Sequence, residues 1–179
     1  MKKIRLLLTV FVGLPLLAGC GYTATRILPS YYRTIYVESF QNAIPITQET
    51  SERGFITNYP ELEEKVTQGV INRFLFDGNL RIINKPDQAD LVLTGKILDF
   101  YRQPIRREND DTVQEYRLNL SASVTLRDKQ GKLLLEEPTL VGDTTYSLTG
   151  ASAKSEVAAV DDLITDFSRR IVEWVIEYW

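Results

Sequence analysis

The feature that most limits the possible folds of this chain is a strict alternation of apolar and polar residues between Tyr116 and Arg127. The apolar positions are Tyr116, Leu118, Leu120, Ala122, Val124 and Leu126. Polar residues fill every position between them. Because successive side chains of a β-strand point to opposite faces, this segment predicts a long strand with one face in a core and the other in water. Such a sheet needs a second layer over its apolar face.

Other strands are predicted on both sides of this segment. The segment from Leu91 to Tyr101 places Leu91, Leu93, Gly95 and Ile97 on one face. The turn residues 128–131 lead into a returning strand from Leu133 to Leu148, with Pro138 as a candidate break. Shorter strands are predicted at 34–40 and 80–83, and the polar segment 41–58 is predicted to be a loop.

Two amphipathic helices would supply the covering layer. The first is predicted from near Pro60 to Gly78, and its apolar face is formed by Leu62, Val66, Val70 and Phe74, widened by Ile71 and Leu75. The second is predicted from about Ser155 to Tyr178. A membrane-surface helix is the alternative for this second segment, but its polar face is acidic and mixed rather than basic, which favours the core. The predicted fold is α+β, with two helices packed on one face of a mostly antiparallel sheet of four to five strands.

The amino-terminal segment has the pattern of a bacterial secretion signal. Lys2, Lys3 and Arg5 precede an apolar run that ends near Leu17 and is shorter than the roughly 20 residues of a membrane-spanning helix. The run leads into Leu17-Ala18-Gly19-Cys20, which resembles the lipobox, and Cys20 is the only cysteine of the chain. An ordinary buried thiol is the alternative for Cys20. Lipidation is favoured, because it consumes a thiol that would otherwise stay unpaired in an oxidising compartment.

These observations divide the chain into a signal peptide at 1–19, a lipidated tether at 20–33 and a single α+β domain at 34–179. In enteric lipoproteins, which the start of the mature chain resembles, an aspartate after the cysteine marks retention in the inner membrane. Gly21 at this position therefore favours the outer membrane, with the domain facing the periplasm. The chain has 21 basic and 24 acidic residues, and three of the basic ones leave with the signal peptide. The mature protein is therefore acidic, which argues against nucleic acid as its partner.

The residues available for chemistry argue against an enzyme. The sequence has no histidine, and its one cysteine is predicted to be lipidated. A nucleophilic triad or a zinc site would need such residues, so we expect neither metal nor cofactor. The carboxylate pairs at 110–111 and 161–162 are the remaining candidates for a catalytic acid and base. Adjacent carboxylates on a loop or helix are, however, more often solvated charges.

The order of features along the mature chain resembles the LptE family, lipoproteins that assemble lipopolysaccharide in the outer membrane. The segments that carry the resemblance are Cys20-Gly21-Tyr22, Leu28-Pro29, Ile35-Tyr36-Val37, 89–97, Glu115-Tyr116-Arg117-Leu118 and Ala151-Ser152-Ala153-Lys154. The resemblance implies a domain that sits as a plug inside the β-barrel protein LptD and helps to deliver lipopolysaccharide to the outer leaflet.

The resemblance also implies where lipopolysaccharide is contacted. It points to a basic residue in the predicted inter-strand loop RQPIRREN, at 102–109, and to the lysine before the closing helix. Arg106, Arg107 and Lys154 are therefore the candidate lipopolysaccharide-binding residues, since arginine and lysine bind phosphate groups. Either Arg106 or Arg107 can be the equivalent residue. The alternative is routine surface charge, balanced by Glu108, Asp110 and Asp111.

A second class of function stays open at this point. The same fold suits a stand-alone periplasmic envelope lipoprotein, such as a pilotin-like chaperone or a structural subunit, with no role in lipopolysaccharide transport. Copurification with a large barrel protein distinguishes the two.

Overall fold

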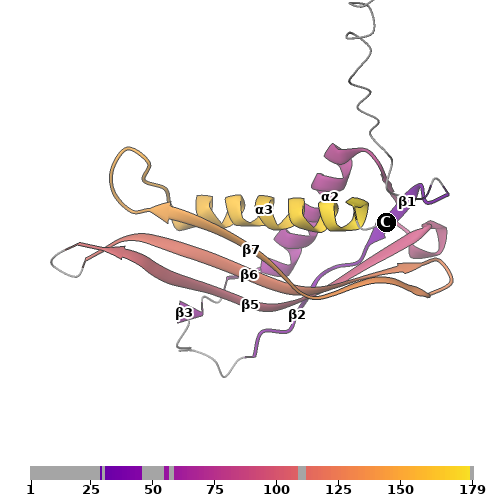
Figure 1. Cartoon of the computed structure of the whole chain (residues 1–179), viewed down its shortest axis with the longest axis horizontal. Coiled ribbons are helices and arrows are strands. Elements are labelled where there is room, and N and C mark those ends of the chain that lie inside the picture. Colours follow the sequence, from indigo (N-terminus) through magenta and orange to yellow (C-terminus); the bar gives the residue numbers. More distant parts are fainter. Residues whose placement is uncertain (1–28, 30, 46–54, 57–58, 109–111, 178–179) are drawn as a thin grey trace, which may run out of the picture.

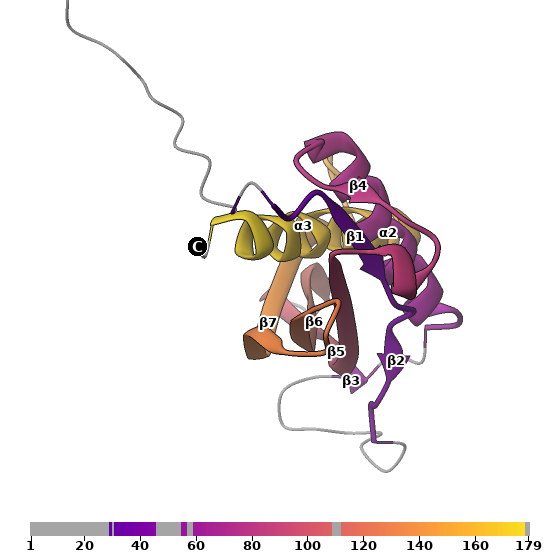
Figure 2. The ribbon, with the colours of Figure 1, turned by 90° about the vertical axis from the view of Figure 1, so that its right-hand side faces the viewer.

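The computed structural model describes residues 29, 31–45, 55–56, 59–108 and 112–177. The predicted signal peptide, the predicted lipidation site Cys20 and the aspartates at 110 and 111 lie outside these residues. The described chain forms a long twisted sheet with two helices on one face (Figures 1 and 2). This confirms the predicted α+β class.

The sheet is mixed. Its strands are β1 (Thr34–Val37), β2 (Gln41–Asn42), β3 (Phe55–Ile56), β4 (Arg81–Ile82), β5 (Leu91–Arg107), β6 (Val113–Asp128) and β7 (Leu133–Ser147). The order is β4-β1-β5-β6-β7, and β2 and β3 pair with β5. The long strands β5, β6 and β7 form the predicted antiparallel meander. β1 runs parallel to both β4 and β5, and β2 runs parallel to β5.

The alternation in β6 is confirmed, because its apolar side chains from Leu118 to Leu126 are all buried. Pro138 does not break β7. It lies where the register shifts from the pair Ala122 and Leu140 to the pair Val124 and Glu137, so the chain accommodates the proline in a bulge. The predicted end of β5 at Tyr101 is wrong. The strand continues to Arg107, and most of the segment predicted as the RQPIRREN loop is paired with β6.

The first helix, α2 (Leu62–Asp77), begins two residues later than predicted, after Glu61 in a left-handed conformation with φ of 59°. It ends at Gly78, where φ is 75° and the N–H donates to the carbonyl of Phe74 at 3.0 Å. Leu62, Val66, Val70 and Phe74 of its predicted stripe are buried, Ile71 is half-buried, and Leu75 is exposed. Successive side chains on a helix are rotated by about 100°, so Leu75 points away from the buried stripe whose last residue is Phe74.

The second helix, α3 (Glu156–Glu177), packs its apolar side over β6 and β7, and α2 packs beside it. Glycines permit both contacts. A Cβ at Gly69 would lie 2.5 Å from the Cγ2 atom of Ile164, and one at Gly142 would lie 2.9 Å from the Cβ of Phe167. The helices and the sheet therefore approach more closely than larger residues would allow. A short 3-10 helix, η2 (Pro86–Gln88), precedes β5.

The segment 41–58 is not a simple loop, contrary to the prediction. β2 and β3 from this segment both add to β5, and the Ala43 N–H donates to the Ile97 carbonyl at 2.9 Å. Strands of two residues are too short to produce a detectable alternation, so sequence periodicity misses them.

The carboxylate of Asp90 joins the start of β5 to the start of β1. Its Oδ2 atom accepts hydrogen bonds from the Arg33 N–H at 3.0 Å, the Thr34 N–H at 3.1 Å and the Thr34 hydroxyl at 2.9 Å. Burial raises the pKa of Asp90, but these hydrogen bonds lower it more, so the pKa in the folded state lies below the ordinary value of 3.8.

We expect Asp90→Ala to lower the free energy of unfolding at pH 7 by about 2 kcal/mol, because it leaves the donors of Thr34 without their acceptor. A group with a lowered folded pKa stabilises the fold above its unfolded pKa. The difference between wild type and variant should therefore shrink as the pH falls below 3.8. Urea unfolding at pH 7 and at successively lower pH measures this. Asp87→Ala, an exposed neighbour, is the control, and an equal loss in both variants would contradict the role of Asp90.

Candidate functional site

The predicted basic residues come together at one end of the sheet. In the sheet, Arg106 of β5 lies opposite Glu115 of β6, and Glu115 lies opposite Ser147 of β7. Ser147 in turn forms an isolated bridge with Ala153, directly before Lys154. Because neighbouring strands lie about 4.8 Å apart, these three steps place the backbones of Arg106 and Ala153 about 14 Å apart. We call Arg106, Arg107 and Lys154 the basic end; in Figure 1 it is the end where β7 turns into α3.

The side chains of the basic end are accessible. Arg106 Nε lies 3.8 Å from Glu115 Oε2, and Lys154 Nζ lies 2.6 Å from Asp162 Oδ2, in both cases with the cation at least half exposed. Arg107 is exposed as well. Ion pairs exposed to water contribute only about 0–1 kcal/mol, so a phosphate group can replace these carboxylates at little cost.

Backbone hydrogen bonds fix the segment between β7 and α3, which contains Lys154. The Lys154 N–H donates to the Ser147 carbonyl at 3.0 Å, and the Leu148 N–H donates to the Gln114 carbonyl at 2.9 Å. The Gln114 side chain bonds the Thr149 hydroxyl on one side and donates to Glu108 Oε2 at 3.0 Å on the other. Gln114 therefore ties the connection after β7 to the end of β5.

Arg102 lies on β5, before Arg106 and Arg107, and its role differs from theirs. Its guanidinium pairs with Glu156, the first residue of α3, and lies 4.6 Å from the centre of the Tyr116 ring. The Tyr146 hydroxyl donates to the same Glu156 carboxylate at 3.4 Å. Burial lowers the pKa of Arg102, but Tyr146 and Glu156 raise it more, so the net pKa lies above its usual value. The arginine stays charged and fixes the start of α3 on the sheet.

Sequence reasoning missed the apolar side chains at the same end. Ile105, Leu148 and Val157 are exposed beside the basic residues. Single apolar residues in strand or helix patterns are normally assigned to the core, so no sequence signal separates them from core residues. They lie at the same end of the fold as the basic residues, where carboxylates pair with Arg102, Arg106 and Lys154.

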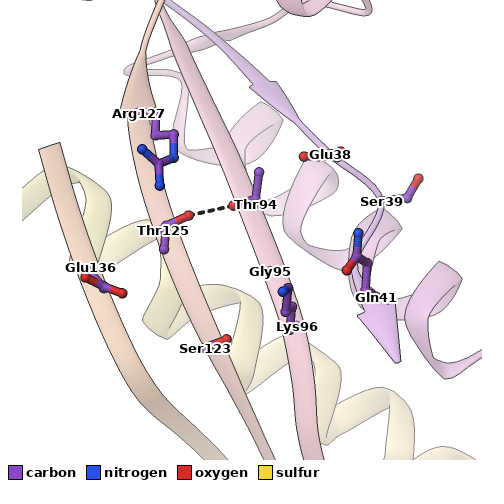
Figure 3. Close-up of a pocket in the computed structure, with 10 residues that line it drawn as sticks. All are labelled: Glu38, Ser39, Gln41, Thr94, Gly95, Lys96, Ser123, Thr125, Arg127 and Glu136. Carbon is purple, nitrogen blue, oxygen red and sulfur yellow. Dashed lines mark hydrogen bonds between the residues drawn. The ribbon is translucent and has the colours of Figure 1, made fainter. Parts of the chain in front are cut away.

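A groove lies on the sheet face opposite the helices (Figure 3). It has a volume of about 320 Å³. Its lining consists of Glu38, Ser39, Gln41, Thr94, Gly95, Lys96, Ser123, Thr125, Arg127 and Glu136. The hydroxyls of Thr94 and Thr125 are hydrogen-bonded at 2.6 Å. The charges of Lys96 and Arg127 are balanced by those of Glu38 and Glu136. The groove is therefore polar but has no net charge that would favour a charged ligand.

Neither a metal site nor a membrane span emerges from the described part of the chain. No group of three or more metal-binding side chains forms among these residues. None of their helices is both long and apolar enough to cross a bilayer. That the protein is not an enzyme stays a prediction.

Solved structures first define the class of protein by its fold. An uncharacterised lipoprotein B from Nitrosomonas europaea matches with a TM-score of 0.54 and 14% identity, covering 89% of this chain and 92% of that one. A protein from Xanthomonas campestris matches with a TM-score of 0.57 and 12% identity, covering 83% and 88%. A hypothetical protein from Chlamydia trachomatis matches with a TM-score of 0.53 and 14% identity, covering 82% and 97%. At these identities the likeness shows a shared fold.

The family follows from the sequence. The model of the LptE family, described as lipopolysaccharide-assembly, matches residues 32–174. The chain therefore belongs to the LptE family, which confirms the resemblance seen in its motifs. A comparison with curated proteins found no match.

Proposed function

We propose that this protein is an outer-membrane lipoprotein that sits as a plug in an LptD-type β-barrel and takes part in delivering lipopolysaccharide to the outer leaflet. The family match over 32–174 is the observation that carries this proposal. In it, residues 1–19 are removed as a signal peptide, Cys20 receives the lipid, and 20–33 tether the domain to the periplasmic side of the membrane.

The polar face of the sheet supports the plug assignment. The groove residues form a wet surface rich in hydroxyl groups and opposite charges. The lumen of a large transmembrane barrel is polar and filled with water, so a domain inside it needs hydrogen-bonding groups on its surface. The buried sides of the two helices cover the other face of the sheet.

The basic end supports direct contact with lipopolysaccharide. Phosphate groups accept strong hydrogen bonds from arginine and lysine, and Arg106, Arg107 and Lys154 present such donors. The exposed Ile105, Leu148 and Val157 lie at the same end and provide apolar surface for acyl chains. A ligand with both phosphates and acyl chains matches both halves of this surface.

We expect the triple variant Arg106→Ala, Arg107→Ala, Lys154→Ala to bind lipopolysaccharide at least tenfold more weakly, because it removes three charged donors to phosphate groups. A tenfold loss corresponds to about 1.4 kcal/mol of binding free energy. The control is Arg81→Ala, Lys85→Ala, Lys129→Ala, which removes the same charge from the other end of the sheet. Binding of labelled lipopolysaccharide, measured by fluorescence anisotropy, compares the two. Wild-type binding by the first variant, or equal losses in both, would rule out the basic end as the contact.

The barrel partnership is tested by affinity purification of the lipidated protein from detergent-solubilised outer membranes, followed by mass spectrometry. We expect a β-barrel of LptD type in stoichiometric amount after a stringent wash. Recovery of the protein alone, or with secretion-machine or inner-membrane proteins, would exclude this function and favour a stand-alone envelope lipoprotein.

A further inference from the structure

Arg102 differs from the neighbouring cations in how little of its side chain reaches water. It is 29% exposed, against 61% for Arg106 and 51% for Lys154. Its partner Glu156 is 30% exposed and is the first residue of α3, two positions after Lys154. We propose that Arg102 is a positioning residue for the basic end: by neutralising Glu156, it leaves the Lys154 ammonium available to a phosphate group of the ligand. This inference rests on the lipopolysaccharide contact in the proposed function.

The ion pair lies where three elements of the basic end meet. Arg102 lies on β5, the strand that also carries the two arginines of the basic end. β7 takes part because the Tyr146 hydroxyl donates to Glu156 Oε2 at 3.4 Å. The next residue, Ser147, accepts the Lys154 N–H at 3.0 Å. The Glu156 carboxylate therefore lies at the junction of the segments that carry the basic end.

Two tyrosines restrict the guanidinium to the position beside Glu156. The Arg102 guanidinium carbon lies 4.6 Å from the centre of the Tyr116 ring. The Tyr116 and Tyr146 rings are themselves stacked, with their centres 5.8 Å apart. A planar guanidinium can stack on an aromatic ring and still bind a carboxylate, which a lysine ammonium cannot do in the same way. The site therefore suits an arginine that stays on Glu156.

The charge of Glu156 matters because the ligand is an anion. Lys154 pairs with Asp162 at 2.6 Å, but both side chains are about half exposed, so water screens this pair and a phosphate group can replace it. Without Arg102, Glu156 would be a partly buried carboxylate close to Lys154. A partly buried charge is screened less than an exposed one, so Glu156 would compete with the phosphate for the lysine. Removing Arg102 alone should therefore weaken binding more than removing Arg102 and Glu156 together.

The test measures the binding of labelled lipopolysaccharide to the full lipidated protein by fluorescence anisotropy. We expect Arg102→Met to bind about fivefold more weakly, because the carboxylate left behind opposes the ligand. The double variant Arg102→Met, Glu156→Gln should bind within about twofold of wild type. Arg117→Met is the matched control and should bind like wild type, because Arg117 is an exposed arginine of β6 that pairs with Asp143. Urea unfolding of each variant ensures that affinities are compared between folded proteins.

The same substitution in a Lys154→Ala background tests whether Arg102 acts through the lysine. We expect Arg102→Met to change the affinity by less than about twofold in that background. Equal losses in both backgrounds, wild-type binding by Arg102→Met, or a double variant that binds no better than Arg102→Met would overturn the positioning role and leave the lipopolysaccharide contact intact. If Lys154→Ala alone binds like wild type, the lysine is not a contact, and the proposed contact and the positioning role fail together.

Discussion

Replacing Gly95 by alanine should lower the free energy of unfolding by about 2–3 kcal/mol, although alanine normally stabilises a strand relative to glycine. The reason is the ring of Phe40, which lies over the glycine. A Cβ at this position would lie 2.1 Å from the Cε1 atom of Phe40, and Phe40 is itself almost fully buried. The ring has little room to move, so the added methyl group has to displace it.

A double-mutant cycle isolates this contact. In a Phe40→Ala background the space over position 95 is open, so we expect Gly95→Ala to cost almost nothing there. The coupling energy between the two positions should therefore be about 2 kcal/mol. Urea unfolding of the two single variants, the double variant and the wild type measures it. If Gly95→Ala costs the same in both backgrounds, the ring is not the cause of the loss.

The same glycine illustrates what sequence patterns predict well. Gly95 continues the alternation of Leu91 and Leu93, which predicts that it lies on the core face of its strand, and the structure confirms this. The alternation in β6 extends over twelve residues, which is long enough to fix both its type and its buried face. Regular and long elements are predictable because each residue repeats the same signal.

The second half of β5 was missed because its signal is interrupted. The register with β6 shifts between Ile97 and Asp99, which moves the inward positions by one residue. Beyond this shift, Pro104 and the charged side chains around it have the composition of a loop. Arg102 can face the helix layer only because Glu156 neutralises it, and this carboxylate is 54 residues away in the sequence.

For the candidate site, the sequence indicated residue types but not their arrangement. The family resemblance and the affinity of their side chains for phosphate point to Arg106 and Lys154. Their common location depends on the pairing of Ser147 with Ala153 and of Glu115 with Ser147, and no local pattern encodes these pairs. Their role as ligands stays a prediction until binding is measured.

The contrast between two phenylalanines on the helices gives the other large effect. Phe167 of α3 is fully buried against Gly142 of β7, whereas Phe76 of α2 is 81% exposed. We expect Phe167→Ala to lower the free energy of unfolding by about 3–5 kcal/mol, because it removes a buried ring and leaves a cavity that the close-packed backbone cannot fill.

Phe76→Ala is the matched control, with the same chemical change in the same kind of element. It should cost at most about 1 kcal/mol, the value of an exposed contact between an arginine and an aromatic ring, which Arg73 makes here. Thermal and urea unfolding of both variants compare them. A loss at Phe76 as large as that at Phe167 would mean that the ring belongs to the core. A small loss would mean that the fold does not require an aromatic ring at this position, which leaves Phe76 free to serve contact outside the domain.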